Sequence, residues 1–249
     1  RLPTARLDGL LLTHFHSDHI AEIYEVNLGS WVNGRPAPLK VWGPRGVDEV
    51  VSAVNAGYRQ DRIYRVGHHG EDLLQPALGV LAHETIEPGV VLEDGELKIT
   101  AYVGEHPPIE PAVGYRFDYR GRSVVISGDS NVNENTLKIA EGADLLLHDA
   151  LSLPTLTALS RALEAVGQTR QSKIVTDVMD YHASTSSLVA LGEQSNVAMV
   201  AYYHLVPVPP NAILKTIFMR GAPDNFVLTE DLMWFELPAH SDEIVVHRP

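Results

Sequence analysis

The chain has 249 residues, of which 45% are hydrophobic and 20% are charged, and its formal net charge is −13. This length and composition are typical of a globular protein that buries its own core, with no apolar run near the roughly 18 residues of a membrane span. Cysteine is absent, which excludes disulfides and thiolate metal sites, so a metal would be held by His, Asp or Glu. Because no cluster of Lys and Arg is visible and the chain is acidic, nucleic acid is not expected as a partner. We expect a soluble protein, periplasmic or cytoplasmic, without membrane contact.

The first half of the chain is predicted to alternate strands and helices. Apolar residues that recur every three or four positions predict an amphipathic helix over Val47–Tyr58, and Asp18–Leu28 also has a helical composition. The segment Gly67–Gly70, which contains two adjacent histidines between glycines, is predicted to be a loop. Strands are predicted at Leu7–Thr13, Leu39–Trp42 and Leu97–Val103, the last preceded by a hairpin-type turn at Glu93–Glu96.

The second half begins with a predicted hairpin of Val113–Tyr119 and Ser123–Ser127. Further strands are predicted at Ala143–His148, Val197–Tyr203, Phe226–Thr229 and Met233–Glu236. Helices are predicted at Asn133–Ala140, Thr155–Val166, Gln171–Met179, Ser186–Gln194 and Asn211–Met219. Two batches of strands, each followed by helices, predict an α/β protein with two packed sheets and outer helices. A single domain over residues 1–249 is the simplest organisation.

Three histidines and an aspartate follow the first predicted strand within six residues. Imidazole and carboxylate are the nitrogen and oxygen ligands that zinc prefers. A strand end can aim such side chains at one point, because the strand holds their backbone in place. We therefore predict that His14 and His16 converge on one metal and that Asp18 and His19 face a second.

Four further predicted strands also end in a histidine or an aspartate. These residues are His106, Asp129, His148 and His204. Functional residues at strand ends are a general feature of α/β folds, so these side chains are candidates for the remaining ligands.

The segment Thr13–His19 resembles the HxHxDH signature of the metallo-β-lactamase superfamily. Other segments resemble the arylsulfatase and ribonuclease Z branch of that superfamily, namely His106–Arg116, Val125–Ser130, Leu146–Asp149, Tyr181–Thr185 and Tyr203–His204. The resemblance covers nearly the whole chain. It implies an α/β fold of the αββα sandwich type, in which two mixed β-sheets pack together between outer helices.

The resemblance also implies a site for two Zn²⁺ ions, for which Mn²⁺ or Fe could substitute. It assigns one metal to His14, His16 and His106, the other to Asp18, His19 and His204, and a bridging position to Asp129. Two such metals hold a bridging hydroxide and stabilise charge on the attacked group. Asp18 could in addition orient this hydroxide, which would make it catalytic.

Five other residues are candidates for roles beside those of the metal ligands. His182 is not needed as a ligand, so it is the candidate for protonating the leaving group or stabilising the oxyanion. His148 and Asp149 are expected to lie behind the ligands and orient them or His182, although ordinary buried polar residues would look alike in sequence. His68 and His69 resemble a segment near the pocket of arylsulfatase-like proteins and could contact substrate, the alternative being a plain surface loop.

The sequence departs from the family pattern in two places. Only a short stretch precedes the HxHxDH motif, so the N-terminal strands of the sandwich are expected to be missing, and an uncovered sheet edge predicts a homodimer or poor solubility. Ribonuclease Z enzymes carry a tRNA-binding arm between the third-motif histidine and the bridging aspartate. Here His106 and Asp129 are only 23 positions apart, and the predicted hairpin fills that interval.

The expected function is that of a dinuclear zinc hydrolase that cleaves small anionic esters of the aryl sulfate or phosphodiester type with a metal-bridging hydroxide. Three alternatives stay open: a lactonase or carboxylic esterase of the same fold, a ribonuclease Z-like RNA phosphodiesterase, and a noncatalytic interaction module. The complete set of candidate ligands argues against the noncatalytic module.

Overall fold

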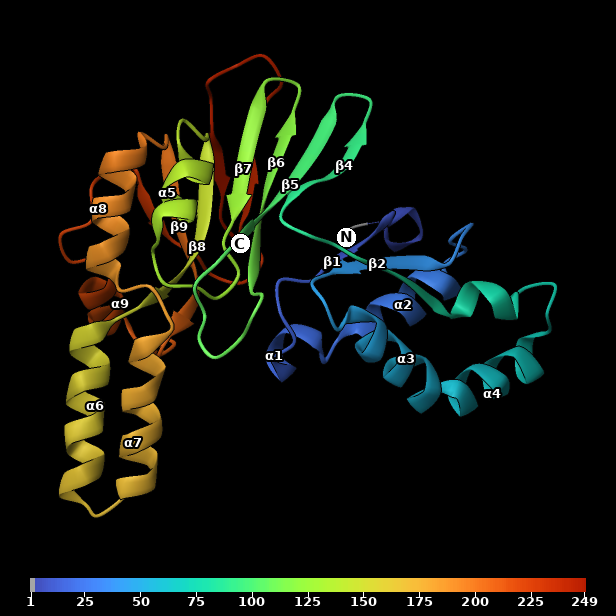
Figure 1. The fold of residues 1–249 in the computed structure, drawn as a ribbon, viewed down its shortest axis with the longest axis horizontal. Coiled ribbons are helices and arrows are strands. Elements are labelled where there is room, and N and C mark those ends of the chain that lie inside the picture. The colour runs from blue at the N-terminus through green and yellow to red at the C-terminus, as the bar shows by residue number, and fades with distance from the viewer. Residues whose placement is uncertain (1–2) are drawn as a thin grey trace. The chain divides into compact units, whose positions relative to one another are not determined.

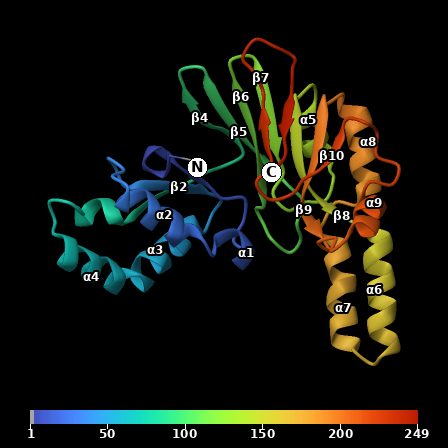
Figure 2. The same ribbon diagram turned by 180° about the vertical axis from the view of Figure 1, so that it is seen from behind.

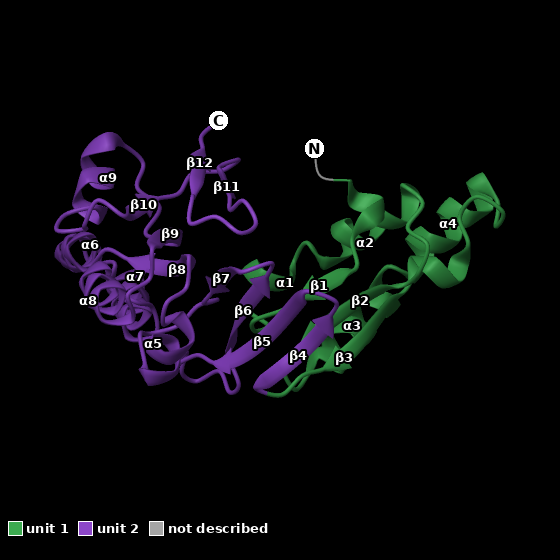
Figure 3. Ribbon diagram, turned by 90° about the horizontal axis from the view of Figure 1, so that it is seen from above, with its two compact units in different colours: residues 1–87 green, residues 88–249 purple. Residues whose placement is uncertain are grey.

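The structure, a computed structural model, describes residues 3–249, and the chain divides into two compact units, Arg1–Glu87 and Pro88–Pro249 (Figure 3). Each unit has its own sheet and its own apolar core. The single-domain organisation expected from the sequence stays a prediction. Within the described residues, no helix has both the length and the apolar character needed to cross a membrane.

The sheet of the first unit has the order β1-β2-β3, with both pairings parallel. Its strands are β1 (Gly9–Leu11), β2 (Leu39–Gly43) and β3 (Leu81–Thr85), and its helices are α1 (Ser17–Ile20), α2 (Ile23–Val32), α3 (Val47–Gly57) and α4 (Arg59–His69) (Figure 1). The helix predicted at Val47–Tyr58 is confirmed as α3. The first predicted strand is shorter than expected, because its pairing with β2 covers only Gly9–Leu11.

The core of the first unit forms between the sheet and α2 and α3. Leu39 and Val41 are fully buried and alternate along β2 with partly exposed residues, as the two-residue period of a strand requires. Val47 and Val51, one helical turn apart, are buried in the same cluster. Gly46, at φ +104°, lets the chain turn from β2 directly into α3. This short turn keeps α3 against the parallel sheet.

The prediction of a loop at Gly67–Gly70 is wrong, because His68 and His69 belong to the last turn of α4. A single glycine inside a helix costs only about 1 kcal/mol, which local contacts can offset. Here the Arg65 Nε donates to Asp61 Oδ2 at 2.7 Å, four residues earlier on the same helix. The helix instead ends at Gly70, whose φ of +85° breaks the helical path.

The sheet of the second unit has the order β10-β9-β8-β7-β6-β5-β4. The pairings from β4 to β7 are antiparallel, and those from β7 to β10 are parallel. The strands are β4 (Gly89–Asp94), β5 (Leu97–Val103), β6 (Val113–Tyr119), β7 (Arg122–Ile126), β8 (Leu145–Leu151), β9 (Met199–Val206) and β10 (Phe226–Leu228). A separate ladder pairs β11 (Trp234–Glu236) with β12 (Val245–His247).

Three helices of the second unit contribute to one extended apolar core with this sheet, namely α5 (Glu134–Ala140), α8 (Thr185–Ser195) and α9 (Ala212–Phe218). The helices α6 (Leu153–Ala165) and α7 (Thr169–Asp177) pack against each other and project from the sheet as a pair (Figure 2). Leu188 of α8 and Phe218 of α9 pack into the same cluster as Leu146 of β8. The run Leu145–Leu147 is apolar throughout because β8 is an interior strand, buried nearly along its whole length.

Two candidate site residues lie inside strands rather than at strand ends, which corrects the prediction for His148 and His204. The strand β8 continues past His148 to Leu151, and β9 continues past His204 to Val206, because the backbone ladder does not depend on side-chain polarity. Tyr203 pairs with Asp149 and Leu205 with Ala150, so His204 is the extra residue of a β-bulge. Its φ is +44°. A bulge of this kind re-aims the side chain that it carries.

Candidate metal centre

The first unit contributes two histidines in the segment after β1. His14 Nε2 lies 3.1 Å from His16 Nδ1. Two nitrogens that bind one tetrahedral zinc at 2.0–2.1 Å are roughly 3.3 Å apart, so this spacing fits two ligands of one metal. The other ring nitrogen of His14, Nδ1, lies 3.1 Å from the hydroxyl of Thr13, a contact that orients the ring and leaves Nε2 for the metal.

Asp18 and His19 lie on α1, immediately after this pair. His19 Nε2 is 3.4 Å from Asp18 Oδ2, and the His19 ring centroid is 4.2 Å from that of His14. The side chain of Asp18 is 62% exposed and that of His19 is 16% exposed, so the carboxylate is much more accessible to solvent than the imidazole. The first unit thus brings two neighbouring pairs of zinc-type donors together, and their binding of a metal stays a prediction.

The second unit contributes His106, Asp129 and His204. Asp129 is buried and follows β7 after Gly128, whose φ of +66° allows a sharp turn. A ligand-type atom of Asp129 lies within 4.8 Å of one on His106 and within 4.8 Å of one on His204. His106 Nδ1 is 3.1 Å from the carbonyl oxygen of Tyr181 and donates to it, which leaves Nε2 available. Asp129 therefore adjoins both histidines, as a bridging ligand would.

His182, Asp149 and His148 form a buried hydrogen-bonded group beside Asp129. His182 Nδ1 lies 2.8 Å from Asp149 Oδ2, and His148 Nδ1 lies 2.8 Å from Asp149 Oδ1. The Asp149 carboxylate also accepts backbone N–H donors from Ser130 and Ala183. The second ring nitrogen of His182, Nε2, is 4.0 Å from Asp129 Oδ2. The ring of His182 is thus held at one nitrogen and faces Asp129 with the other.

The Asp149 carboxyl is ionised in this environment. Burial raises its pKa, but hydrogen bonds and charge interactions with His148 and His182 outweigh burial and hold the pKa below its usual value. A carboxylate can only accept hydrogen bonds, so His182 must carry a proton on Nδ1. For Tyr203, burial together with the charges of Asp149 and Asp129 raises the pKa, so its phenol stays neutral.

Two serines that the sequence analysis did not single out support this arrangement. Ser130 Oγ accepts the backbone N–H of Glu105 at 2.8 Å, which ties the loop before His106 to the turn that carries Asp129. Ser127 Oγ accepts the backbone N–H of Asp149 at 3.2 Å. Their position on either side of Gly128-Asp129 could have indicated this role from the sequence, because short hydroxyl side chains often form hydrogen bonds that hold tight turns.

His68 and His69 lie at the exposed C-terminal end of α4 in the first unit. Their ring centroids are 4.7 Å apart. Their contact with substrate stays a prediction.

The donor set of both units consists of imidazole nitrogens and carboxylate oxygens, in keeping with a protein without cysteine. These donors suit zinc and are also compatible with manganese or iron. The side chains therefore fit a metal centre by their chemistry, while the identity of the metal is open.

Comparisons with known proteins place these observations in a family. The family model of the β-lactamase superfamily domain matches residues 1–177. Ribonuclease Z of Mycobacterium bovis (strain BCG / Pasteur 1173P2) is 34% identical over 206 residues, which cover 82% of this chain and 69% of the relative. A putative ribonuclease Z of Mycobacterium tuberculosis is 33% identical over 201 residues, 80% of this chain and 84% of the relative.

Solved structures agree with the fold. A metallo-β-lactamase fold protein from Bacillus subtilis has a TM-score of 0.56 at 18% identity, covering 91% of this chain and 76% of its own. The short form of human tRNase Z has a TM-score of 0.55 at 17% identity, covering 94% of this chain and 80% of its own.

The prediction that nucleic acid is not a partner is wrong, because the matching relatives are named ribonucleases. The prediction relied on the net charge of the whole chain, which averages over all faces and does not decide the charge of one site. The fold expected from the sequence is confirmed. The chain belongs to the metallo-β-lactamase superfamily of hydrolases and is related in sequence to ribonuclease Z.

Proposed function

We propose that this hydrolase is a metal-dependent phosphodiesterase that cleaves RNA. The observation that carries the proposal is the sequence relationship to ribonuclease Z over four fifths of the chain, together with a full set of metal donors. The relationship favours the ribonuclease alternative over the aryl sulfate substrate that the sequence analysis put first.

The residues that would hold two metal ions in this proposal are those that the sequence resemblance assigns. They are His14, His16 and His106 for one ion, Asp18, His19 and His204 for the other, and Asp129 for both. The spacing of His14 and His16 and the position of Asp129 beside two histidines support this assignment. When bound, the metals would acidify a water molecule and neutralise charge on the phosphate.

His182 acts as the proton donor to the leaving oxygen in this scheme. Its Nδ1–H is directed at Asp149, so a second proton on Nε2 would point toward Asp129 and the reacting phosphate. The Asp149 carboxylate accepts the Nδ1–H of His182 and thereby fixes the orientation of the ring. Departure of a ribose oxygen needs such a proton, because an alkoxide is a poor leaving group.

The test compares substrates on the purified, metal-loaded chain. We expect cleavage of an RNA panel that includes a transfer-RNA precursor, and little or no hydrolysis of p-nitrophenyl sulfate. Asp129→Ala, prepared in parallel, should be inactive and thereby exclude a contaminating nuclease. Hydrolysis of the sulfate ester with no cleavage of any RNA would refute the proposal.

A further inference from the structure

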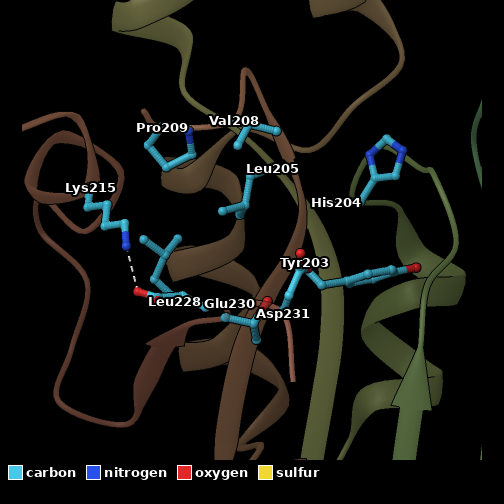
Figure 4. A pocket seen from close by; sticks show the side chains of 10 residues that line it. Tyr203, His204, Leu205, Val208, Pro209, Lys215, Leu228, Glu230 and Asp231 are labelled. Carbon is cyan, nitrogen blue, oxygen red and sulfur yellow. Dashed lines mark hydrogen bonds and ion pairs between the residues drawn. The ribbon is translucent and has the colours of Figure 1, made fainter. Parts of the chain in front are cut away.

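A cavity of about 620 Å³ opens in the second unit beside His204 (Figure 4). Its walls come from the end of β9 and the following loop, from β10 and the residues after it, and from α9. Pockets that bind small ligands usually measure roughly 300–1,000 Å³. His204, a proposed metal ligand, is one of the residues that line this cavity, so the cavity adjoins a residue of the candidate metal centre.

One wall of the cavity is apolar. Leu205, Val208, Pro209 and Leu228 all line it, and Val208 is 75% exposed. An exposed aliphatic side chain on a concave surface has no role in the core, but it can contact a flat ring. Apolar and aromatic surfaces hold nucleobases by contact with their faces, whatever the base.

Charged side chains also line the cavity. Lys215 Nζ donates to Glu230 Oε1 at 2.6 Å, and Asp231 lies next to Glu230 (Figure 4). The hydrogen bond from Lys215 lowers the pKa of Glu230, so this carboxyl is ionised at neutral pH. One lysine and two carboxylates leave a net charge of −1 on the cavity wall. This wall repels a phosphate and accepts hydrogen bonds from N–H groups.

We propose that the cavity binds the nucleobase of the nucleotide adjoining the scissile phosphate, and that it prefers bases with an exocyclic amine over uracil. The inference rests on the proposed RNA phosphodiesterase activity and names the substrate feature that this site recognises. Carboxylates accept hydrogen bonds from the amine of cytosine, whereas uracil presents a carbonyl oxygen at the same position. The apolar wall supplies contact area and the carboxylates supply the selectivity.

The test measures binding, so that it does not depend on RNA cleavage. The metal-loaded protein is titrated calorimetrically with cytidine monophosphate, uridine monophosphate and ribose 5-phosphate. A hydrogen bond to a charged acceptor corresponds to about tenfold or more in affinity. We expect cytidine monophosphate to bind about tenfold more tightly than uridine monophosphate, and ribose 5-phosphate to bind most weakly of the three.

Two variants, each with a matched control, test whether the cavity produces the difference in nucleotide affinity. Val208→Trp places a bulky side chain in the cavity and should remove the tighter binding of both nucleotides relative to ribose 5-phosphate. The control Val166→Trp changes a valine that is 69% exposed at the end of α6, and the affinities should stay as in the wild type. Asp231→Ala should reduce the preference for cytidine, whereas Asp242→Ala, at another exposed aspartate outside the cavity, should not.

Equal affinity for the three ligands, or unchanged affinities in Val208→Trp, would overturn the inference. Absence of nucleotide binding would overturn it as well. Failure of the wild-type protein to cleave RNA is a separate result, which would count against the proposed function. The titrations test nucleobase binding in the cavity independently of that result.

Discussion

The substitution His182→Ala tests the proposed proton donor directly. The His182 side chain is 6% exposed, its Nδ1 donates to Asp149 at 2.8 Å, and its Nε2 lies 4.0 Å from Asp129. Positioned general acids contribute about 10²–10⁴-fold to a rate, or roughly 2.7–5.5 kcal/mol. This contribution is needed only when the leaving group is basic. We therefore expect His182→Ala to slow RNA cleavage by about 10²–10⁴-fold and to slow bis(p-nitrophenyl) phosphate hydrolysis by less than about tenfold.

The structure also indicates what else this substitution changes. Asp149 loses one hydrogen-bond donor but keeps His148 and the backbone N–H groups of Ser130 and Ala183. The loss should lower the free energy of unfolding by about 1–3 kcal/mol, which thermal denaturation can measure, and leave the protein folded. Metal content by elemental analysis should equal that of the wild type, because His182 is not a proposed ligand.

The assay compares kcat for both substrates in His182→Ala and in the control His83→Ala, which removes an exposed histidine of β3. The control should match the wild type on both substrates. Equal losses on the activated and the unactivated substrate would refute proton donation, and so would loss of metal from His182→Ala.

Three further predictions concern the metal centre, acid stability and the core. Asp129→Ala should abolish activity and lower the bound metal per chain, as measured by elemental analysis, since Asp129 adjoins both histidines of its unit. Hydrogen bonding from Arg65 holds the pKa of Asp61 below its ordinary value of 3.8. The stabilisation from Asp61 is therefore present above about pH 4 and lost as the pH falls through the lower, folded-state pKa, so Asp61→Asn should lower the Tm at neutral pH and weaken its fall in acid. Leu146→Ala, at a fully buried position, should lower the free energy of unfolding by about 2–5 kcal/mol in a urea titration.

Local patterns were sufficient to predict most elements of the second unit. The hairpin of β6 and β7 and the strand β5 follow from alternating residues and a glycine turn, which depend on neighbours in sequence. The interior position of β8 likewise follows from its apolar run. The strands β3, β4 and β12 were not predicted, because none of them has a strong pattern of its own and each is held by its pairing with a neighbouring strand.

The sequence by itself determined the family and the chemical identity of the candidate metal donors, because the HxHxDH motif and a chain without cysteine leave only nitrogen and oxygen ligands. Only the tertiary structure decided how the surrounding groups act. The hydrogen bond between Asp149 and His182 joins residues 33 positions apart, and the hydrogen bond between Lys215 and Glu230 joins two residues that line the cavity. Neither contact has a local signal, since both depend on the order and register of the strands that bring these residues together.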